Sequence, residues 1–158
     1  MRTISRCLVL AGGLAFSAST LHAADPAVTG TFRSNGKDAK IAFATAKKGE
    51  PISGKQTIDV VLTEKDTAAD PKPEFGADFG KFGSSLTITL TTPDGQIVRC
   101  QVNHDANTRG VFSSIGKLKA ENLKIEGALV SAHLTTSGPV QTFGNTWDVD
   151  LTFRTKIR

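Results

Sequence analysis

The sequence predicts an all-β fold: a single antiparallel β-sandwich of immunoglobulin-like architecture, formed by residues 24–158. Three observations predict it. Apolar and polar residues alternate along the C-terminal segment, residues 85–104 have the pattern of a hairpin, and no segment of ten or more residues shows helical periodicity. A closed β-barrel of the lipocalin type is the second choice. The resemblance to immunoglobulin domains concerns architecture only, because their Cys–Trp–Cys spacing is absent.

The C-terminal segment gives the clearest strand. Its apolar residues fall on one side of an extended chain, and its charged and hydroxyl residues fall on the other. The apolar side consists of Trp147, Val149, Leu151, Phe153 and Ile157. This period of two is typical of a strand with one face in the core and one face in water.

Residues 85–104 form a predicted hairpin. Leu86, Ile88 and Leu90 alternate with threonines, and the returning strand carries Val98 and Cys100 in the same alternation. The Pro-Asp-Gly sequence at 93–95 between them favours a tight turn, because proline fixes φ and glycine tolerates a positive φ.

Weaker alternation predicts the remaining strands. They lie at residues 28–34, at 40–46 after the Asn35-Gly36 turn, at 56–63, and on both sides of Gly127, where the apolar phase shifts. About eight strands joined by short turns favour a sandwich or a barrel.

One connection, residues 64–83, is long for a compact domain, and such loops are often functional. It contains Phe75, Phe79 and Phe82, whose spacing would place the rings on one side of a helical turn. The functional interpretation is a contact surface for an apolar ligand or a protein partner. The structural interpretation is that the rings plug one open end of the sandwich, and it is favoured because large apolar residues are usually buried. Nearby glycines disfavour a stable helix.

Other candidate groups have a structural interpretation as well. The acidic residues of the long loop do not match the spacing of a calcium-binding loop, which predicts a solvated loop. We expect His104 and His133 to be surface or strand-end histidines, and Cys100 to be a buried, inert thiol. Asp148 and Asp150 belong to the polar face of the C-terminal strand.

Residues 1–23 have the layout of a secretory signal peptide. Arg2 and Arg6 precede a short apolar run, and small residues follow at Ala23 and Ala24. The run is shorter than the roughly 20 residues that span a bilayer. We therefore expect a soluble mature chain with no transmembrane segment, located in the periplasm or secreted.

Charge and composition limit the function classes. Residues 1–23 contain two Arg and no acidic residue, so the remainder carries a net charge of +2 rather than +4. So small a charge, without a clustered basic patch, argues against nucleic-acid binding. No nucleophile motif or metal-ligand spacing occurs, so we expect no cofactor and no metal site.

The leading hypothesis is a non-catalytic module of the cell envelope that binds an envelope protein or a small apolar ligand. One alternative is a secreted hydrolase or metal-assisted enzyme using His104 or His133, and another is an assembly protein that pairs through a sheet edge.

Overall fold

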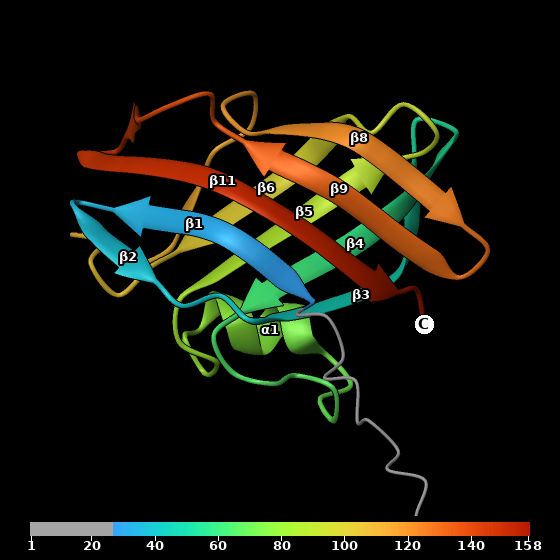
Figure 1. Ribbon diagram of the computed structural model, residues 1–158, viewed down its shortest axis with the longest axis horizontal. Coiled ribbons are helices and arrows are strands. Elements are labelled where there is room, and N and C mark those ends of the chain that lie inside the picture. Colours follow the sequence, from blue (N-terminus) through green and yellow to red (C-terminus); the bar gives the residue numbers. More distant parts are fainter. Residues whose placement is uncertain (1–26) are drawn as a thin grey trace, which may run out of the picture.

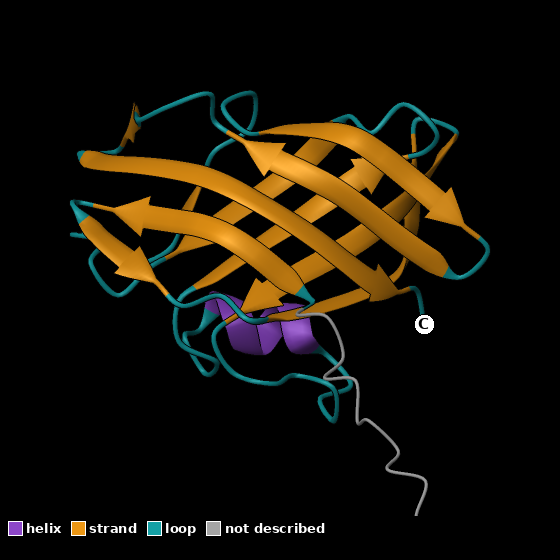
Figure 2. Cartoon of the chain, in the orientation of Figure 1, coloured by secondary structure: helices purple, strands orange, loops and turns teal. Residues whose placement is uncertain are grey.

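Two antiparallel β-sheets packed against each other make up most of the computed structural model, which describes residues 27–158 (Figures 1 and 2). The predicted all-β sandwich is confirmed, and the barrel alternative is wrong because the strands form two separate sheets. The predicted signal peptide, residues 1–23, lies outside the described residues. No helix within the described part is long and apolar enough to cross a membrane.

The first sheet combines strands from both ends of the described chain. Its order is β2-β1-β11-β9-β8, and β10 also pairs with β11. The C-terminal strand is central because its long alternating pattern pairs with β1 on one side and with β9 on the other. The bounds are β1 Val28–Ser34, β2 Lys37–Ala39, β8 Lys119–Glu126, β9 Leu129–Thr135, β10 Val140–Thr142 and β11 Asn145–Lys156.

The second sheet is a sequential meander with the order β3-β4-β5-β6-β7. Its hairpin β5–β6 is the one that the sequence predicts. The bounds are β3 Phe43–Ile52, β4 Lys55–Thr63, β5 Ser85–Thr91, β6 Ile97–Asn103 and β7 Phe112–Ser113.

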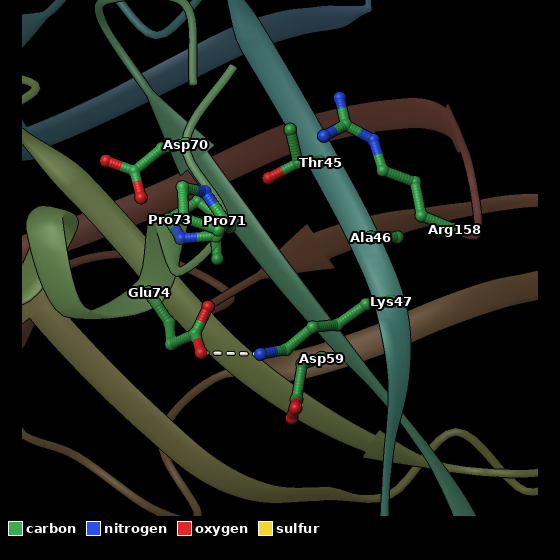
Figure 3. A pocket seen from close by; sticks show the side chains of 10 residues that line it. Thr45, Ala46, Lys47, Asp59, Asp70, Pro71, Pro73, Glu74 and Arg158 are labelled. Carbon is green, nitrogen blue, oxygen red and sulfur yellow. Dashed lines mark hydrogen bonds and ion pairs between the residues drawn. The ribbon is translucent and has the colours of Figure 1, made fainter. Parts of the chain in front are cut away.

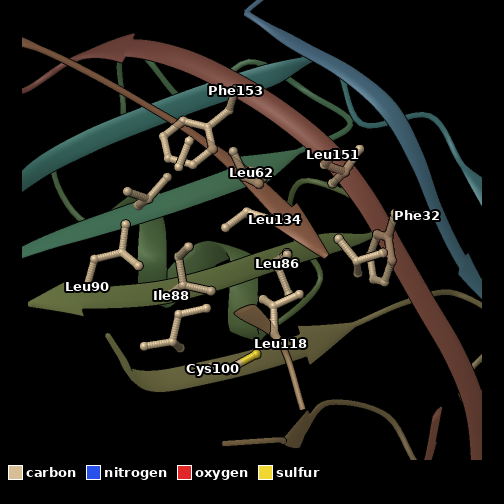
Figure 4. Close-up of a cluster of buried hydrophobic side chains, with 14 of the residues drawn as sticks. Phe32, Leu62, Leu86, Ile88, Leu90, Cys100, Leu118, Leu134, Leu151 and Phe153 are labelled. Carbon is tan, nitrogen blue, oxygen red and sulfur yellow. The ribbon is translucent and has the colours of Figure 1, made fainter. Parts of the chain in front are cut away.

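The core lies between the two sheets and consists of the inward-facing residues of the predicted alternation (Figure 4). Leu86, Ile88 and Leu90 of β5 face Leu151 and Phe153 of β11, and all five are essentially buried. Burial of such side chains is the main favourable term in folding.

One predicted strand, residues 40–46, is wrong in its bounds. The Asn35-Gly36 turn, with φ values of 49° and 78°, closes a short hairpin between β1 and β2. The chain then leaves the first sheet, and β3 begins only at Phe43 and continues to Ile52. Ile41 packs against the core as the chain crosses between the sheets.

A short helix, α1 (Pro73–Asp78), lies at the lower margin of the sandwich in Figure 1 and contacts β4, β5 and β6. Its Ala77 packs with Val61, whose side chain points away from the core, so the helix lies on the outer side of the second sheet. It covers the start of β5, where the Ser85 hydroxyl donates to the Ala77 carbonyl oxygen at 3.1 Å; the outward-facing threonines of β5 are buried as well. It also covers Val61, an apolar residue at an outward-facing position of β4.

Candidate functional site

Residues 64–84, which we name the α1 segment, connect β4 to β5. Thr63 and Ser85, the residues on either side of it, are directly paired in the sheet. The α1 segment is therefore an enlarged hairpin loop whose two ends meet, and its helix lies over the strands that it connects.

Glu64 fixes both ends of the α1 segment. Its Oε1 atom accepts a hydrogen bond from the Lys40 backbone N–H at 3.0 Å, and its Oε2 atom accepts one from the Ser84 N–H at 3.1 Å. The Lys65 N–H also donates to the Phe82 carbonyl oxygen at 3.2 Å. These contacts hold the segment in one position relative to the sandwich.

Helix α1 forms although its sequence contains a glycine. Pro73 occupies the first turn, where its missing N–H costs nothing, and Glu74 is favourable near the positive end of the helix dipole. A Cβ atom on Gly76 would lie 2.5 Å from Cε2 of the Phe82 ring. The glycine thus allows this ring to pack against the helix.

The three phenylalanines of the predicted site separate into two groups. The rings of Phe75 and Phe79 lie side by side with centroids 4.7 Å apart, and the residues are 64% and 75% exposed. Phe82 is 6% exposed and packs with Val61 and Ala77. The helix ends at Asp78, and Gly80 has a φ of 71°, so the chain turns back and brings Phe82 beneath the helix.

Neither sequence interpretation therefore describes all three rings. The prediction that the rings plug an open end of the sandwich is wrong, because the one buried ring, Phe82, fills the space between α1 and the outer face of the second sheet. Phe75 and Phe79, which we name the aromatic pair, are left on the surface.

The acidic residues of the α1 segment form separate ion pairs and do not converge on one point. Glu74 pairs with Lys47 of β3, Asp78 lies 3.2 Å from the Arg99 guanidinium, and Asp70 lies 2.6 Å from Lys81 Nζ. Burial raises the pKa of Asp78, and the Arg99 charge opposes that rise. The acidic residues thus attach the segment to the sheet and to itself.

A pocket of about 200 Å³ lies between the α1 segment and strands β3 and β4 (Figure 3). Thr45 and Val61 contribute from the sheet, and Pro71 and Pro73 contribute from the segment. The Lys47–Glu74 ion pair and Arg158 also line it. The Oε2 atom of Glu74 is buried without a hydrogen-bond partner. Sites for drug-sized ligands usually enclose about 300–1,000 Å³, so this pocket suits a single side chain.

The aromatic pair lies next to this pocket. A shallow hollow is lined by both rings and by Asp70, Pro71 and Lys72, of which Asp70 and Pro71 also line the pocket. Among the described residues, Lys72 has no ion-pair partner. The surface around the rings is therefore apolar in its centre with an unpaired positive charge at its rim.

His104 follows β6 and is 4% exposed, so it is a strand-end histidine but not a surface one. Its Nδ1 atom accepts a hydrogen bond from the Ala106 N–H at 3.0 Å, which places the proton of the neutral ring on Nε2. The ring packs edge-to-face on Phe32 at 5.0 Å, and the Phe32 ring belongs to the core. Burial lowers the pKa of His104.

A lowered histidine pKa in the folded state makes stability depend on pH. The stability that His104 contributes is present above its ordinary pKa of 6.5 and is lost as the pH falls through its lower folded value, because the unfolded chain binds the proton more readily. We expect His104→Asn, whose side-chain oxygen can replace Nδ1, to lose less unfolding free energy between about pH 7.5 and 5 than the wild type. Urea titrations across this range measure it. An equal loss in both proteins would contradict the assignment.

His133 lies on the outer face of the first sheet, where the sequence places it. Its Nε2 atom is 2.6 Å from Oδ1 of Asp150, and its Nδ1 atom is 3.5 Å from Oε2 of Glu121. The hydrogen bond to Asp150 raises the pKa of His133. The two histidines thus have separate surroundings, and within residues 27–158 no three His, Cys, Asp or Glu side chains are arranged to hold a metal ion.

The remaining candidates from the sequence, Cys100, Asp148 and Asp150, lie in the core or on the outer face of the first sheet. Cys100 is fully buried in the core, and burial raises its pKa to about 12. Asp148 lies opposite Arg33 in the first sheet, and Asp150 is bound to His133.

Sequence reasoning missed two features. The pocket brings together β3, the α1 segment and Arg158, which are distant in sequence. Phe143, at the turn between β10 and β11, is 68% exposed with a φ of 48°, and its ring lies 6.5 Å from that of Phe112. Val61 was the one available signal for the covered face, because it is apolar where the alternation of β4 faces outward.

No family model, no curated protein and no solved structure matches this chain.

Proposed function

We propose that this chain is an exported, non-catalytic binding module of the cell envelope, and that its α1 segment binds a protein partner. The observation that carries the proposal is the aromatic pair: two adjacent phenylalanines, both more than half exposed, on a segment that Glu64 holds in place. Aromatic residues are enriched at the centres of protein interfaces, and exposed apolar clusters often mark such surfaces. Export rests on the signal-peptide pattern of residues 1–23.

A protein partner fits the site better than a small apolar ligand. The space between the sheets is filled by core side chains, and the pocket beside the aromatic pair has a volume of only about 200 Å³. The hollow lined by the two rings is larger, about 380 Å³, but it is shallow and open, whereas ligand sites usually bury most of the ligand surface. A polypeptide can cover both rings and place a side chain in the pocket at the same time. The enzyme alternative draws no support from the histidines, since His104 is buried against Phe32 and His133 is bound between two carboxylates.

The charges define the kind of partner. Lys72 lies at the rim without an ion-pair partner among the described residues, whereas the neighbouring Lys81 is neutralised by Asp70. The partner segment should therefore present aliphatic or aromatic side chains next to an acidic one. An acidic residue at the rim contributes to specificity and association rate more than to affinity.

The test uses a displayed library of random short peptides, selected on the purified processed protein. We expect enrichment of apolar residues beside Asp or Glu. The Phe75→Ser/Phe79→Ser variant should bind the selected peptides at least about tenfold more weakly, because central aromatic residues each contribute more than about 1 kcal/mol. Its unfolding free energy should change by about 0.5 kcal/mol or less per substitution, since both rings are exposed. Lys72→Glu should reduce binding of the acidic peptides selectively.

Phe143→Ser is the matched control. It removes a phenylalanine of similar exposure that lies in the turn between β10 and β11, away from the α1 segment, so peptide binding should be unchanged. Peptides that bind the double variant as well as the wild type would overturn the proposed site. If no peptide is enriched but a small apolar dye binds in a manner dependent on Phe75 and Phe79, the partner is a small ligand and the proposed protein partner is wrong.

A further inference from the structure

A second surface, independent of the α1 segment, is the outer edge of β8. This strand ends the order of the first sheet, lies at the upper margin of the front sheet in Figure 1, and contains no buried residue. The other edge strands are shorter or partly occupied: β2, β7 and β10 have three, two and three residues, and the Arg158 N–H donates to the Ala46 carbonyl oxygen on β3. An uncovered strand edge presents unpaired backbone groups to another strand.

Along β8 the charges alternate in sign, so that the sequence of charges read from one end is opposite to that read from the other end. The four charged residues of β8 are, from the N-terminal end, Lys119, Glu121, Lys124 and Glu126. If a second copy of β8 is placed antiparallel to the first, with a two-fold axis between Asn122 and Leu123, position 119 meets 126 and position 121 meets 124. Every lysine of one strand then lies opposite a glutamate of the other.

A bulge in β8 makes this arrangement possible. Positions 119 and 126 are seven residues apart, so a regular strand would direct their side chains to opposite faces. In the structure Asn122 has a φ of 54°, and one extra residue of β8 lies between Glu121 and Lys124. The four charged residues consequently lie opposite Thr135, His133, Ser131 and Leu129 of β9. These alternate positions share one face of the sheet, so the charged residues share it too.

We infer that two copies of this chain associate through their β8 strands, which continues the first sheet across a two-fold axis. Opposite charges at facing positions of an antiparallel pair are favourable, and like charges are unfavourable. The same register places Ala120 opposite Ile125, which is 42% exposed in the single chain. Shifting the register by two residues in either direction brings Lys119 opposite Lys124 or Glu121 opposite Glu126, so the charges select one alignment.

Sedimentation equilibrium of the processed protein tests the inference. At low salt we expect the weight-average mass to rise toward twice the monomer value with concentration, and association to weaken at high salt because exposed ion pairs are screened. Lys119→Glu places two glutamates opposite each other at both ends of the pair and should weaken dimerisation at least about tenfold. Lys119→Glu/Glu126→Lys exchanges the two charges, makes the edge self-complementary again and should restore association.

Circular dichroism and urea titrations confirm that each variant is folded, which is expected because both positions are exposed. A wild-type protein that stays monomeric up to millimolar concentration would overturn the inference. Dimerisation that is equal in the single and the double variant would also overturn it, because the interface would then lie elsewhere. Phe75→Ser/Phe79→Ser should dimerise as the wild type does, which separates this test from that of the α1 segment.

Discussion

Replacement of Gly30 by alanine is expected to destabilise the protein by about 3 kcal/mol or more, which would put it among the largest effects of a single substitution. Gly30 lies within β1, opposite Leu151 of the central strand β11, and has a φ of 113°. A side chain rarely adopts this backbone conformation, and a Cβ atom there would lie 2.0 Å from the Asp150 carbonyl oxygen. Because that oxygen belongs to the backbone of β11, only separation of the two strands relieves the collision.

Gly36→Ala separates the collision from the backbone strain. Gly36 also has a positive φ, 78°, but no atom beyond its two neighbours in the chain lies within 4 Å of the position that its Cβ would occupy. Strain alone costs about 1–3 kcal/mol. Urea unfolding of both variants, followed by circular dichroism, should therefore show a clearly larger loss for Gly30→Ala. Equal losses would mean that β1 is not held against β11 at this position.

Trp147→Ala is expected to cost about 3–5 kcal/mol of unfolding free energy, the range for truncation of large aromatic residues in a core. The Trp147 side chain is fully buried at the start of β11. Its ring packs edge-to-face against Phe112 at 5.8 Å, and its Nε1–H donates to Oγ1 of Thr142 at 3.1 Å. The substitution removes contacts between β11, β10 and the second sheet, and it leaves a cavity. Since small domains are stable by about 5–15 kcal/mol, this loss is a large share of the total, and the variant should unfold at a clearly lower urea concentration than the wild type.

The measurement needs a probe other than tryptophan fluorescence, because Trp147 is the only tryptophan of the chain. Circular dichroism in urea serves this purpose. Trp147→Phe is the matched control, since it keeps most of the ring volume and loses the hydrogen bond, and it should cost distinctly less. If both variants are equally destabilised, the hydrogen bond to Thr142 rather than core packing determines the effect.

The sequence was sufficient to predict the sandwich because alternation records which side of a strand faces the core. Trp147, Val149, Leu151 and Phe153 alternate as predicted and are buried. The β5–β6 hairpin could be predicted equally well, because its turn residues restrict the backbone locally. Strands such as β2, β7 and β10 are too short to show a period, and their pairing depends on contacts with residues far along the chain.

The sequence predicts only part of the candidate site, because the rest depends on contacts between residues far apart along the chain. Helical spacing correctly predicts that Phe75 lies beside Phe79. The burial of Phe82 depends on where the helix ends and on the outward-facing Val61 against which the ring packs. The sequence places His104 at the end of a strand or at the surface; the strand-end position is correct, but its burial against Phe32 of the opposite sheet depends on a contact distant in sequence. The common face of the β8 charges depends on the bulge at Asn122, which no local pattern locates.

The direct pairing of Thr63 with Ser85 also has a consequence for how this molecule can change over time. Everything between these two residues begins and ends at the same point of the scaffold, and the hydrogen bonds of β4 with β5 continue without it. Insertions, deletions or exchange of residues 64–84 would therefore leave the strand ladder in place, while uncovering Val61 and removing the ion pairs of the segment with Lys47 and Arg99. Binding preference and scaffold stability can thus evolve separately, and the same excision point offers a place to graft foreign recognition loops.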